Sequence, residues 1–379
     1  MCAQNQAIAG DNPERDNLMI EQVNISNFRC FKILEISELK KINLIVGENS
    51  SGKSAFLESI FISSSSFAPG TVFQMRGIRR MGGQVIAPAD PQAYRGLWED
   101  LFYDFQQDKP VSIKVHGNPN SETRTLSIQY VAPVGVQELP FEKQASTSTS
   151  TTQQQLGGMP QVEFSWKRTN YPKIVSRPKM TSNGLQFDVP EAAFFPCWWS
   201  TPGVPESPDD NAKRFSELDK KGESNAIWEV LAREFNFIEG LSIDYHAGHP
   251  MVFAKLDGKS RKFPIPLVSD GVNRLMGICL GIASFKGGTV LIDQIEDGFH
   301  HKLLPSIWKS IYTLATTFNV QLFVSTHSAE CIRAMLPIIK GHEDDFCLLR
   351  SFRKESGCGI DSLTGKYLES AVEQDFEVR

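Results

Sequence analysis

The feature that most constrains this chain is a glycine-containing loop between two apolar segments. Residues 47–54 read Gly-Glu-Asn-Ser-Ser-Gly-Lys-Ser, which fits the pattern G-x-x-x-x-G-K-[ST]. The run Ile42–Val46 before the loop is typical of a buried strand, and residues 54–61 after it are typical of an apolar helix. A strand, this loop and a helix in that order form the context in which the pattern cradles the phosphates of a nucleotide.

The loop is therefore predicted to bind the phosphates of ATP. Its two glycines let the backbone wrap closely, so that N–H groups and the helix N-terminus face the phosphates. The ammonium of Lys53 is expected to reach the β- and γ-phosphates, and the hydroxyl of Ser54 is expected to bind Mg²⁺. The predicted phosphate-binding residues are Gly47, Glu48, Asn49, Ser50, Ser51, Gly52, Lys53 and Ser54.

Two later strands end in residues that suit the same site. Residues 289–293 (TVLID) read as a buried parallel strand with Asp293 at its carboxyl end, where it would hold Mg²⁺ through the water shell of the metal. Residues 321–327 (QLFVSTH) form another apolar run and end in His327. That histidine would contact the γ-phosphate or orient the attacking water, and the alternative is a capping histidine at a strand–helix turn.

A short Ser-x-Gly segment precedes the strand that ends in Asp293. Residues 268–274 read VSDGVNR and lead into an apolar helix. Ser269 is expected to be the N-cap of that helix, and Gly271 would let a phosphate approach the backbone closely. The chain thus carries a phosphate-binding loop, a Ser-x-Gly segment, an acidic strand end and a histidine, in that order.

This order of motifs resembles the ABC-ATPase heads of the SMC, Rad50 and OLD (overcoming lysogenization defect) proteins. Residues 27–31 (NFRCF) match the N-terminal NFR-x-F strand of these heads, and residues 293–301 (DQIEDGFHH) are similar to the OLD stretch DEIENGLHH. The last residues, 377–379 (EVR), resemble the end of short, stand-alone AAA15-like OLD ATPases that lack a Toprim nuclease domain. The chain is therefore expected to lack that domain too.

The resemblance implies an α/β fold, an ABC-ATPase head in which helices flank a mixed β-sheet core. It implies a discontinuous ATPase domain over residues 18–110 and 225–379. Residues 111–224 would be an inserted, strand-rich and irregular region with a flexible Ser/Thr/Gln linker at 145–158. Residues 1–17 are expected to be a disordered leader.

Two segments have less regular patterns. Residues 89–107 are predicted to form one helix. Residues 199–224 are rich in Pro, Ser, Asp and Lys and are expected to be exposed and partly mobile.

The resemblance also implies that two copies of the chain clamp ATP between them. In ABC heads the Ser-x-Gly segment covers the γ-phosphate of ATP that is bound to the partner. A homodimer or a higher oligomer is therefore expected. The residues that would act across this interface are Ser269, Gly271 and Arg274 of the Ser-x-Gly segment, with Asp297 and Gly298 of the D-loop.

Other assignments near the loop follow from the resemblance or stay open. Asn27, Phe28 and Arg29 would lie on the adenine side of the nucleotide. The Q-loop residue is either Gln74 or Gln84. A cluster of arginines after the loop helix is either a solvated face or a contact for a phosphate or a partner. These arginines are Arg76, Arg79 and Arg80.

Gln294 departs from the family pattern, which places Glu after the strand-end Asp to polarise the attacking water. An amide accepts a hydrogen bond but is far too weak a base to take a proton at neutral pH, so ATP binding should survive while turnover falls. Two explanations are open, a naturally slow enzyme or an introduced Glu-to-Gln change that traps the ATP state. We favour the second, because the surrounding residues match the family. Glu296 faces the same side of an extended segment and is the candidate substitute base.

Composition limits the partners and the compartment. The formal net charge of -5 argues against coating by nucleic acid, so nucleic-acid binding is expected to be weak or carried by a partner. The seven cysteines form no CxxC pair and suit a reducing cytoplasm. No apolar run is long enough to span a membrane, so a cytoplasmic protein without a membrane partner is expected.

These observations favour an ATP-binding and ATP-hydrolysing molecular switch that oligomerises on ATP. The resemblance implies the sensor or regulator subunit of a bacterial anti-phage or toxin–antitoxin-like system, acting on a separate effector such as a nuclease or toxin. An SMC- or Rad50-like DNA maintenance ATPase is the alternative, and it is weakened because the chain has no long heptad arms. A nuclease activity of the chain itself would need an acidic metal cluster beyond the ATP site, which the sequence does not offer.

Overall fold

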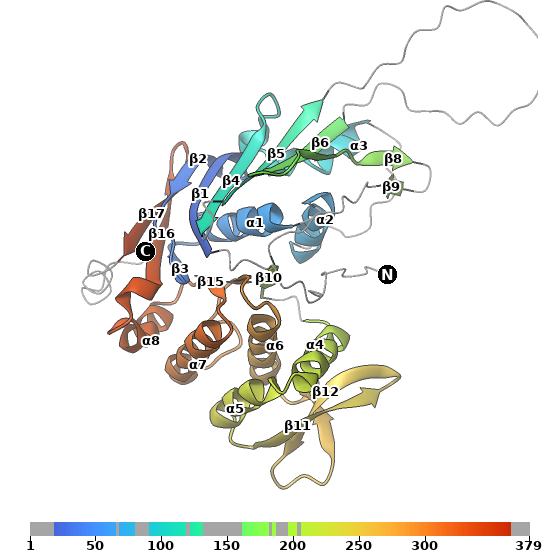
Figure 1. The fold of residues 1–379 in the computed structure, drawn as a ribbon, viewed down its shortest axis with the longest axis vertical. Helices are drawn as coiled ribbons and strands as arrows, with labels where there is room; N and C mark the ends of the chain where they lie inside the picture. The colour runs from blue at the N-terminus through green and yellow to red at the C-terminus, as the bar shows by residue number, and fades with distance from the viewer. Residues whose placement is uncertain are drawn as a thin grey trace, which may run out of the picture.

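The computed structural model describes residues 19–65, 68–79, 91–118, 122–131, 161–181, 184–186, 196–202 and 206–364. Two six-stranded sheets enclose a helix, and further helices cover the other face of the second sheet (Figure 1). A three-stranded sheet lies beyond these helices, at the bottom of Figure 1. The expected leader 1–17 and linker 145–158 lie outside the described residues.

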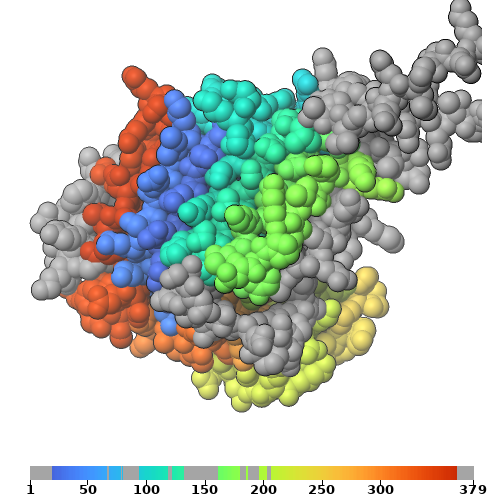
Figure 2. Space-filling model, turned by 45° about the horizontal axis from the view of Figure 1, so that its top comes forward, coloured from blue at the N-terminus to red at the C-terminus, as the bar shows by residue number. Residues whose placement is uncertain are grey.

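The first sheet is antiparallel throughout, in the order β2-β1-β4-β5-β6-β7. Its strands are β1 (Met19–Phe28), β2 (Phe31–Ile36), β4 (Val111–Asn118), β5 (Glu122–Val131), β6 (Gln161–Arg168) and β7 (Ile174–Ser176). In β5 the buried side chains of Leu126 and Ile128 alternate with partly exposed ones, as in a sheet with one face on the core. Figure 2 shows the outer face of this sheet as adjoining blue, teal and green bands.

The second sheet has the order β10-β14-β15-β3-β16-β17 and is parallel except for its last hairpin. Its strands are β3 (Ile42–Val46), β10 (Cys197–Ser200), β14 (Thr289–Ile292), β15 (Gln321–Ser325), β16 (Phe346–Lys354) and β17 (Gly357–Thr364). Every residue of β3, β14 and β15 is buried, which explains why these strands read as continuous apolar runs. The carboxyl ends of these three parallel strands meet at one edge of the sheet.

Helix α1 (Lys53–Ser64) lies between the two sheets (Figure 1). Its side chains pack on both sides, with Phe56, Leu57 and Ile60 fully buried. The ring of Phe56 meets Phe323 of the second sheet in an edge-to-face contact with the centroids 6.2 Å apart. A helix that is enclosed in this way is apolar on all sides, which is why its sequence shows no amphipathic stripe.

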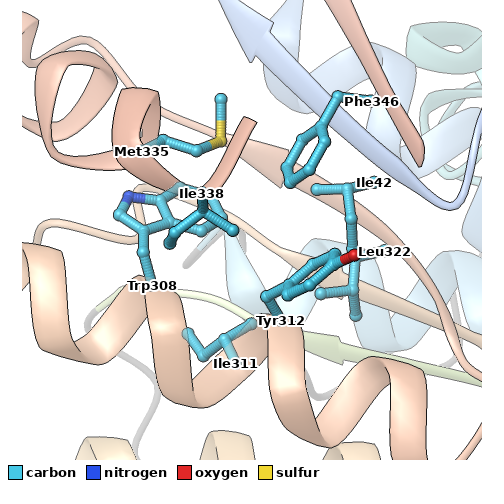
Figure 3. A pocket seen from close by; sticks show the side chains of 8 residues that line it. All are labelled: Ile42, Trp308, Ile311, Tyr312, Leu322, Met335, Ile338 and Phe346. Atoms are coloured by element: carbon cyan, nitrogen blue, oxygen red, sulfur yellow. The ribbon is translucent and has the colours of Figure 1, made fainter. Parts of the chain in front are cut away.

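Five longer helices cover the other face of the second sheet or extend that layer. They are α4 (Pro208–Lys220), α5 (Ser224–Glu234), α6 (Asp270–Ser284), α7 (Leu304–Thr317) and α8 (Ala329–Ile339). A small apolar hollow lies between α7, α8 and the sheet (Figure 3). It is lined by Ile42, Trp308, Ile311, Tyr312, Leu322, Met335, Ile338 and Phe346. The Tyr312 hydroxyl donates a hydrogen bond to Asp345 at 2.7 Å, and the rest of the lining is apolar, so the hollow belongs to the core.

The three-stranded sheet consists of β11 (Ile238–His246), β12 (His249–Leu256) and β13 (Lys262–Pro264). It packs against α4 and α5, and its last strand leads through a short turn into α6. Of the helices that the structure describes, none has both the length and the apolar character needed to cross a bilayer.

The remaining elements complete the described part of the chain. They are α2 (Ala68–Ile78), α3 (Pro91–Gly96), β8 (Lys179–Thr181), β9 (Gly184–Gln186) and the 3₁₀ turns η1 (Glu99–Leu101), η2 (Tyr103–Phe105), η3 (Ile265–Leu267), η4 (His301–Leu303) and η5 (Glu343–Asp345).

The expected strands at 20–25, 31–36 and 42–46 are confirmed, and so is the helix that follows the loop. The expectation of one helix over 89–107 is wrong over its described part, where a helix of six residues is followed by two 3₁₀ turns. Asp104 has a left-handed φ of 48°, which an α-helix cannot continue through.

Within residues 199–224, the described residues 206–224 form more regular structure than their composition suggests. Ser207 caps α4 by accepting from the Asp210 N–H, and Pro208 suits the first turn. Phe215 and Leu218 bury one face of this helix. The apolar stripe outweighs the high content of Asp and Lys.

Residues 111–224 differ from the expectation of an inserted region. Strand β4 pairs with β1 along most of its length, and β10 pairs with β14 at the edge of the parallel sheet. The middle of the chain therefore supplies strands to both sheets that surround α1. The expected α/β class with a mixed sheet flanked by helices is confirmed.

Candidate nucleotide-binding site

The phosphate-binding loop leaves β3 and enters α1 through two glycines with left-handed backbone. Gly47 has φ +140° and Gly52 has φ +107°. A Cβ on Gly47 would lie 2.1 Å from the carbonyl oxygen of Ser351, so no other residue fits there. The Ser351 hydroxyl donates to the carbonyl of Ser51 at 2.7 Å and holds the loop against β16. No side chain caps α1, and the first N–H groups of such a helix suit an anion.

Lys53 folds back over the loop. Its Nζ donates to the carbonyl oxygens of Gly47 and Glu48, both at 2.7 Å. Burial lowers the pKa of Lys53, while the negative charges of Asp293, Glu296 and Glu48 act in the opposite direction. The ammonium thus lies over the concave side of the loop and close to the acidic residues that follow β14.

The structure brings the predicted metal ligands together. The Ser54 hydroxyl donates to Oδ2 of Asp293 at 2.9 Å, although the two residues are 239 positions apart. The Ser325 hydroxyl, at the end of β15, donates to the other oxygen of the same carboxylate. A hydroxyl beside a carboxylate is a hard oxygen donor set, which fits Mg²⁺ bound largely through water. Within the described ranges no cluster of three His, Cys, Asp or Glu side chains forms a separate metal site.

Gln294 follows Asp293 just beyond the end of β14, at the edge where the parallel strands end. Its backbone is left-handed, with φ 49°, and its N–H donates to the Ser325 hydroxyl at 2.8 Å. The same hydroxyl therefore fixes both Asp293 and the start of the next turn. Ser325 was not singled out in the sequence, and its position as the last residue of β15 is the signal that could have revealed it.

Glu296 and His327 form a pair across the site. Nδ1 of His327 lies 2.9 Å from Oε1 of Glu296, and the His327 backbone N–H donates to the same oxygen at 2.9 Å. The histidine side chain is 49% exposed, while the glutamate is 12% exposed. Ser328, not His327, is the N-cap of α8, which removes the alternative of a capping histidine.

The start of α6 has the geometry expected of the Ser-x-Gly segment. Ser269 is the N-cap, and its hydroxyl accepts from the N–H of Val272 at 3.2 Å. A Cβ on Gly271 would lie 2.9 Å from the carbonyl oxygen of Gly298, so the glycine allows the two turns to pack closely. Ser269 and Asp270 are exposed, and the helix begins at the surface.

Arg274 differs from the expectation that it acts on the partner's ATP. Its guanidinium donates to the backbone carbonyls of Asp293 at 3.0 Å and of Gln294 at 2.7 Å in the same chain. It also lies 3.8 Å from the carboxylate of Asp297. Arg274 therefore holds the turn after β14, because that turn has carbonyl groups that no strand partner satisfies.

The expected adenine contacts are not supported at the end of β1. Phe28 is fully buried and offers no surface to a base. The Asn27 side chain donates to the carbonyls of Gln106 at 3.0 Å and Lys109 at 2.7 Å, which ties β1 to the segment before β4. These two residues hold the sheet together.

Arg29 is also engaged within the chain. It lies 3.1 Å from Glu58 of α1 and 2.5 Å from Asp100, with 8% of its side chain exposed. Arg79 pairs with Glu58 at 2.5 Å, and Arg76 pairs with Asp100 at 3.2 Å. Arg29 and Arg79 therefore anchor the loop helix through the buried carboxylate of Glu58, and Arg76 is held by Asp100, although the side chain of Arg79 stays 38% exposed.

Of the remaining residues that the sequence singled out near the loop helix, only Gln74 lies in the described part of the chain. Gln74 lies half-buried in α2. Arg80 and Gln84 lie outside the described residues.

Two protein families match this chain. The family described as "AAA ATPase domain" matches residues 19–180. The family described as "AAA domain, putative AbiEii toxin, Type IV TA system" matches residues 190–333.

Two curated relatives match this chain over very different lengths. An ATP/GTP phosphatase of Helicobacter pylori is 22% identical over 350 residues, which cover 86% of this chain and 90% of that protein. The DNA replication and repair protein RecF of Idiomarina loihiensis is 42% identical over 60 residues, which cover 15% of this chain and 17% of that protein.

Solved SMC heads are similar at low identity. A crystal structure of the SmcHead bound to the C-winged helix domain of ScpA is 14% identical, with a TM-score of 0.44, over 91% of this chain and 98% of that chain. The SMC head domain from Thermotoga maritima is 10% identical, with a TM-score of 0.41, over 91% of this chain and 99% of that chain.

The two matched families together span most of the sheets and the whole candidate site, from the loop to His327. The loop, Asp293 and Ser54 meet at one edge of the parallel sheet, as nucleotide binding requires. Both matched families are AAA families, and together they cover most of the chain, which is therefore similar to AAA-type ATPases that bind and hydrolyse ATP.

Proposed function

We propose that the chain is an ATP-driven switch in which two copies clamp ATP between them and separate after hydrolysis. The observation that carries the proposal is the hydrogen bond of 2.9 Å between Ser54 of the loop and Asp293, the residue that follows β14. It brings together the residues that would bind the phosphates and the residues that would hold the metal. The start of α6, by contrast, is exposed and would complete the site of a second copy.

In the first copy, the backbone of residues 47–54 would surround the phosphates. Lys53 would exchange its two carbonyl partners for the β- and γ-phosphate oxygens. Ser54 and Asp293 would hold Mg²⁺, which would neutralise part of the phosphate charge. This arrangement needs no movement of the strands, because Ser325 already fixes the Asp293 carboxylate.

In the second copy, Ser269 and Gly271 would present the N-terminus of α6 to the γ-phosphate of the ATP that the first copy binds. A helix N-terminus favours a negative charge through its free N–H groups and its dipole. Gly298 lies directly beside Gly271, and both Gly298 and the preceding Asp297 are exposed, so they would contact the partner as well. Arg274 would support this surface from behind by holding the carbonyls of residues 293 and 294.

For hydrolysis, the attacking water needs a group that orients it and accepts its proton. Gln294 would orient the water but cannot act as the base at neutral pH. Glu296 would take that role, with His327 held against it and facing the solvent side where a γ-phosphate would arrive. We therefore expect slow turnover with intact ATP binding.

The cellular role that we propose is a sensor or regulator subunit in the cytoplasm of a bacterium, within an anti-phage or toxin–antitoxin-like system. One matched family bears the name of an AbiEii toxin and a type IV TA system, which supports this role. ATP-driven pairing would control a separate effector such as a nuclease or toxin. Mass spectrometry of proteins that co-purify with the chain, with and without ATP, would identify that effector.

A second candidate function is DNA maintenance, which the 60-residue match to RecF favours. The formal net charge of -5 predicts that the isolated chain binds nucleic acid weakly. Tight binding by the isolated chain that weakens steeply with salt would favour this second function over the first.

The proposed pairing is tested by light scattering of the chain with and without ATP and Mg²⁺. We expect the mass to rise to that of a dimer or higher oligomer only with nucleotide, and Gly271→Arg to prevent the rise. Gly77→Arg is the matched control, because Gly77 is an exposed helical glycine with nothing within 4 Å of its added Cβ. A mass that does not respond to ATP, or that responds equally in both variants, would contradict the pairing.

A further inference from the structure

Two cysteines from distant parts of the chain meet beside the phosphate-binding loop. Cys30 lies in the turn between β1 and β2, and Cys358 lies in β17. The backbone N–H of Cys358 donates to the carbonyl of Cys30 at 2.8 Å, which brings the two residues side by side. Both are free thiols.

The loop packs directly on this pair. A Cβ on Gly52 would lie 3.0 Å from the sulfur of Cys30 and 3.1 Å from the Cβ of Cys358. The sulfur of Cys358 also lies 3.9 Å from the carbonyl oxygen of Ser50. Since residues 50 and 52 belong to the expected phosphate cradle, a shift of either sulfur would alter the packing of the loop.

The two thiols are electronically unequal. The neighbouring Cys30 side chain lowers the pKa of Cys358, while the neighbouring Cys358 side chain, together with burial, raises the pKa of Cys30. Burial instead raises the pKa of the other described cysteines to about 12. These are Cys197, Cys279, Cys331 and Cys347. Among the cysteines that the structure describes, Cys358 is therefore the one that favours the reactive thiolate form.

We propose that Cys30 and Cys358 are a peroxide-sensitive pair, and that the disulfide between them weakens ATP binding at the adjacent loop. This inference rests on ATP binding by the loop and not on the pairing of two copies. The pair would then make the nucleotide site responsive to oxidants as well as to its ligand.

The chemistry needs a hydroperoxide as the oxidant. The Cys358 thiolate attacks one peroxide oxygen, the O–O bond breaks, and the leaving hydroxide takes a proton to become water. The sulfenic acid formed on Cys358 is then attacked by the Cys30 sulfur, the S–O bond breaks, and a second water leaves with the proton of Cys30. Two thiols lose two electrons in total, and one hydrogen peroxide is reduced to two waters.

The disulfide would change the surface on which the loop rests. Bond formation draws the sulfurs to about 2.05 Å, well inside the distance of any non-bonded contact. Gly52 and Ser50 would lose their present contacts with the two thiols, and the N–H groups around them would turn away from the phosphates. The loss of one or two hydrogen bonds to a charged ligand corresponds to about tenfold weaker ATP binding.

The test compares the full chain before and after treatment with stoichiometric hydrogen peroxide. Peptide mapping is expected to show a bond between Cys30 and Cys358, and calorimetry is expected to show about tenfold weaker ATP binding, which a thiol reductant reverses. The variants Cys30→Ser and Cys358→Ser should bind ATP equally before and after peroxide. Cys197→Ser should respond like the parent, since Cys197 lies outside the pair.

Three outcomes would overturn the proposal. They are a peroxide-treated chain without the bond, a bond with unchanged ATP affinity, and a loss of affinity that persists in Cys358→Ser. A reduced chain that does not bind ATP would remove the ATP site itself and the proposal with it. If a serine variant fails to fold, the reversal by reductant in the parent chain decides instead.

Discussion

The phosphate-binding loop and the start of α6 are built in opposite ways. The loop is held from several sides by its own chain, through Ser351, the Cys30–Cys358 pair and the hydrogen bond from Ser54 to Asp293. The start of α6 has its N-cap and its packing on Gly298, and is otherwise exposed. Leu267, two residues before the cap, is 69% exposed.

The difference indicates that the loop and the start of α6 have separate roles in ATP binding. A site whose groups are already hydrogen-bonded to one another can bind its ligand without a second copy. The capped start of α6 lies at the surface, and its N–H groups and dipole favour an anion. The phosphate-binding loop of the same chain, however, leads into a different helix, α1. The predictions below test whether the first region works alone and whether the second needs a partner.

The largest expected effect is on the loop side. Gln294→Glu should raise the rate of ATP hydrolysis by about 10²–10⁴, because it supplies a carboxylate base beside Asp293. Single-turnover hydrolysis at saturating ATP measures the change. Equal rates for the parent and the variant would show that the proton leaves by another route.

Removal of the loop ammonium should abolish most of the affinity. Lys53→Ala is expected to weaken ATP binding by about two orders of magnitude, because charge-assisted hydrogen bonds to the phosphates are lost. Calorimetry with ATP and Mg²⁺ measures the affinity, and Lys114→Ala, an exposed lysine of β4, is the control. Unchanged affinity in Lys53→Ala would remove the loop from the ATP site.

A smaller effect is expected at the pair formed by Glu296 and His327. Glu296→Gln should lower the residual turnover of the parent chain by about tenfold, because the amide cannot take a proton and releases His327. ATP affinity should stay near that of the parent. Glu229→Gln, an exposed residue of α5, is the control. Residual turnover that persists in Glu296→Gln would exclude this carboxylate as the base.

The sequence predicted the parts of the fold whose pattern is local. Strands β3, β14 and β15 are buried on both faces, so their apolar runs are unambiguous. Helix α4 was missed, because its Asp and Lys residues hide the stripe of Ala212, Phe215 and Leu218. The pairing of β4 with β1 depends on a contact between distant segments, which no local pattern reports.

The candidate site, like the fold, could be predicted only where the sequence pattern is local. Residues 47–54 and Asp293 were found because loop chemistry and a strand end are readable in sequence. The sequence could not show that Arg274 donates to carbonyls of the same chain, that Phe28 is buried, or that Ser325 fixes Asp293. Each of these depends on which turns meet in space. Burial among distant segments turned Arg29 from an expected ligand contact into an anchor of α1.

The central claim, that the start of α6 serves the ATP of a second copy, is tested most directly by a change of charge at Ser269. Asp and Asn are both good N-caps, so Ser269→Asp and Ser269→Asn should keep α6 intact and differ only in charge. We expect light scattering to show ATP-promoted association at least about tenfold weaker in Ser269→Asp, because the carboxylate repels the partner's phosphates, while Ser269→Asn associates like the parent. ATP affinity of the single chain should be equal in both variants. Equal association of the two variants would contradict the claim.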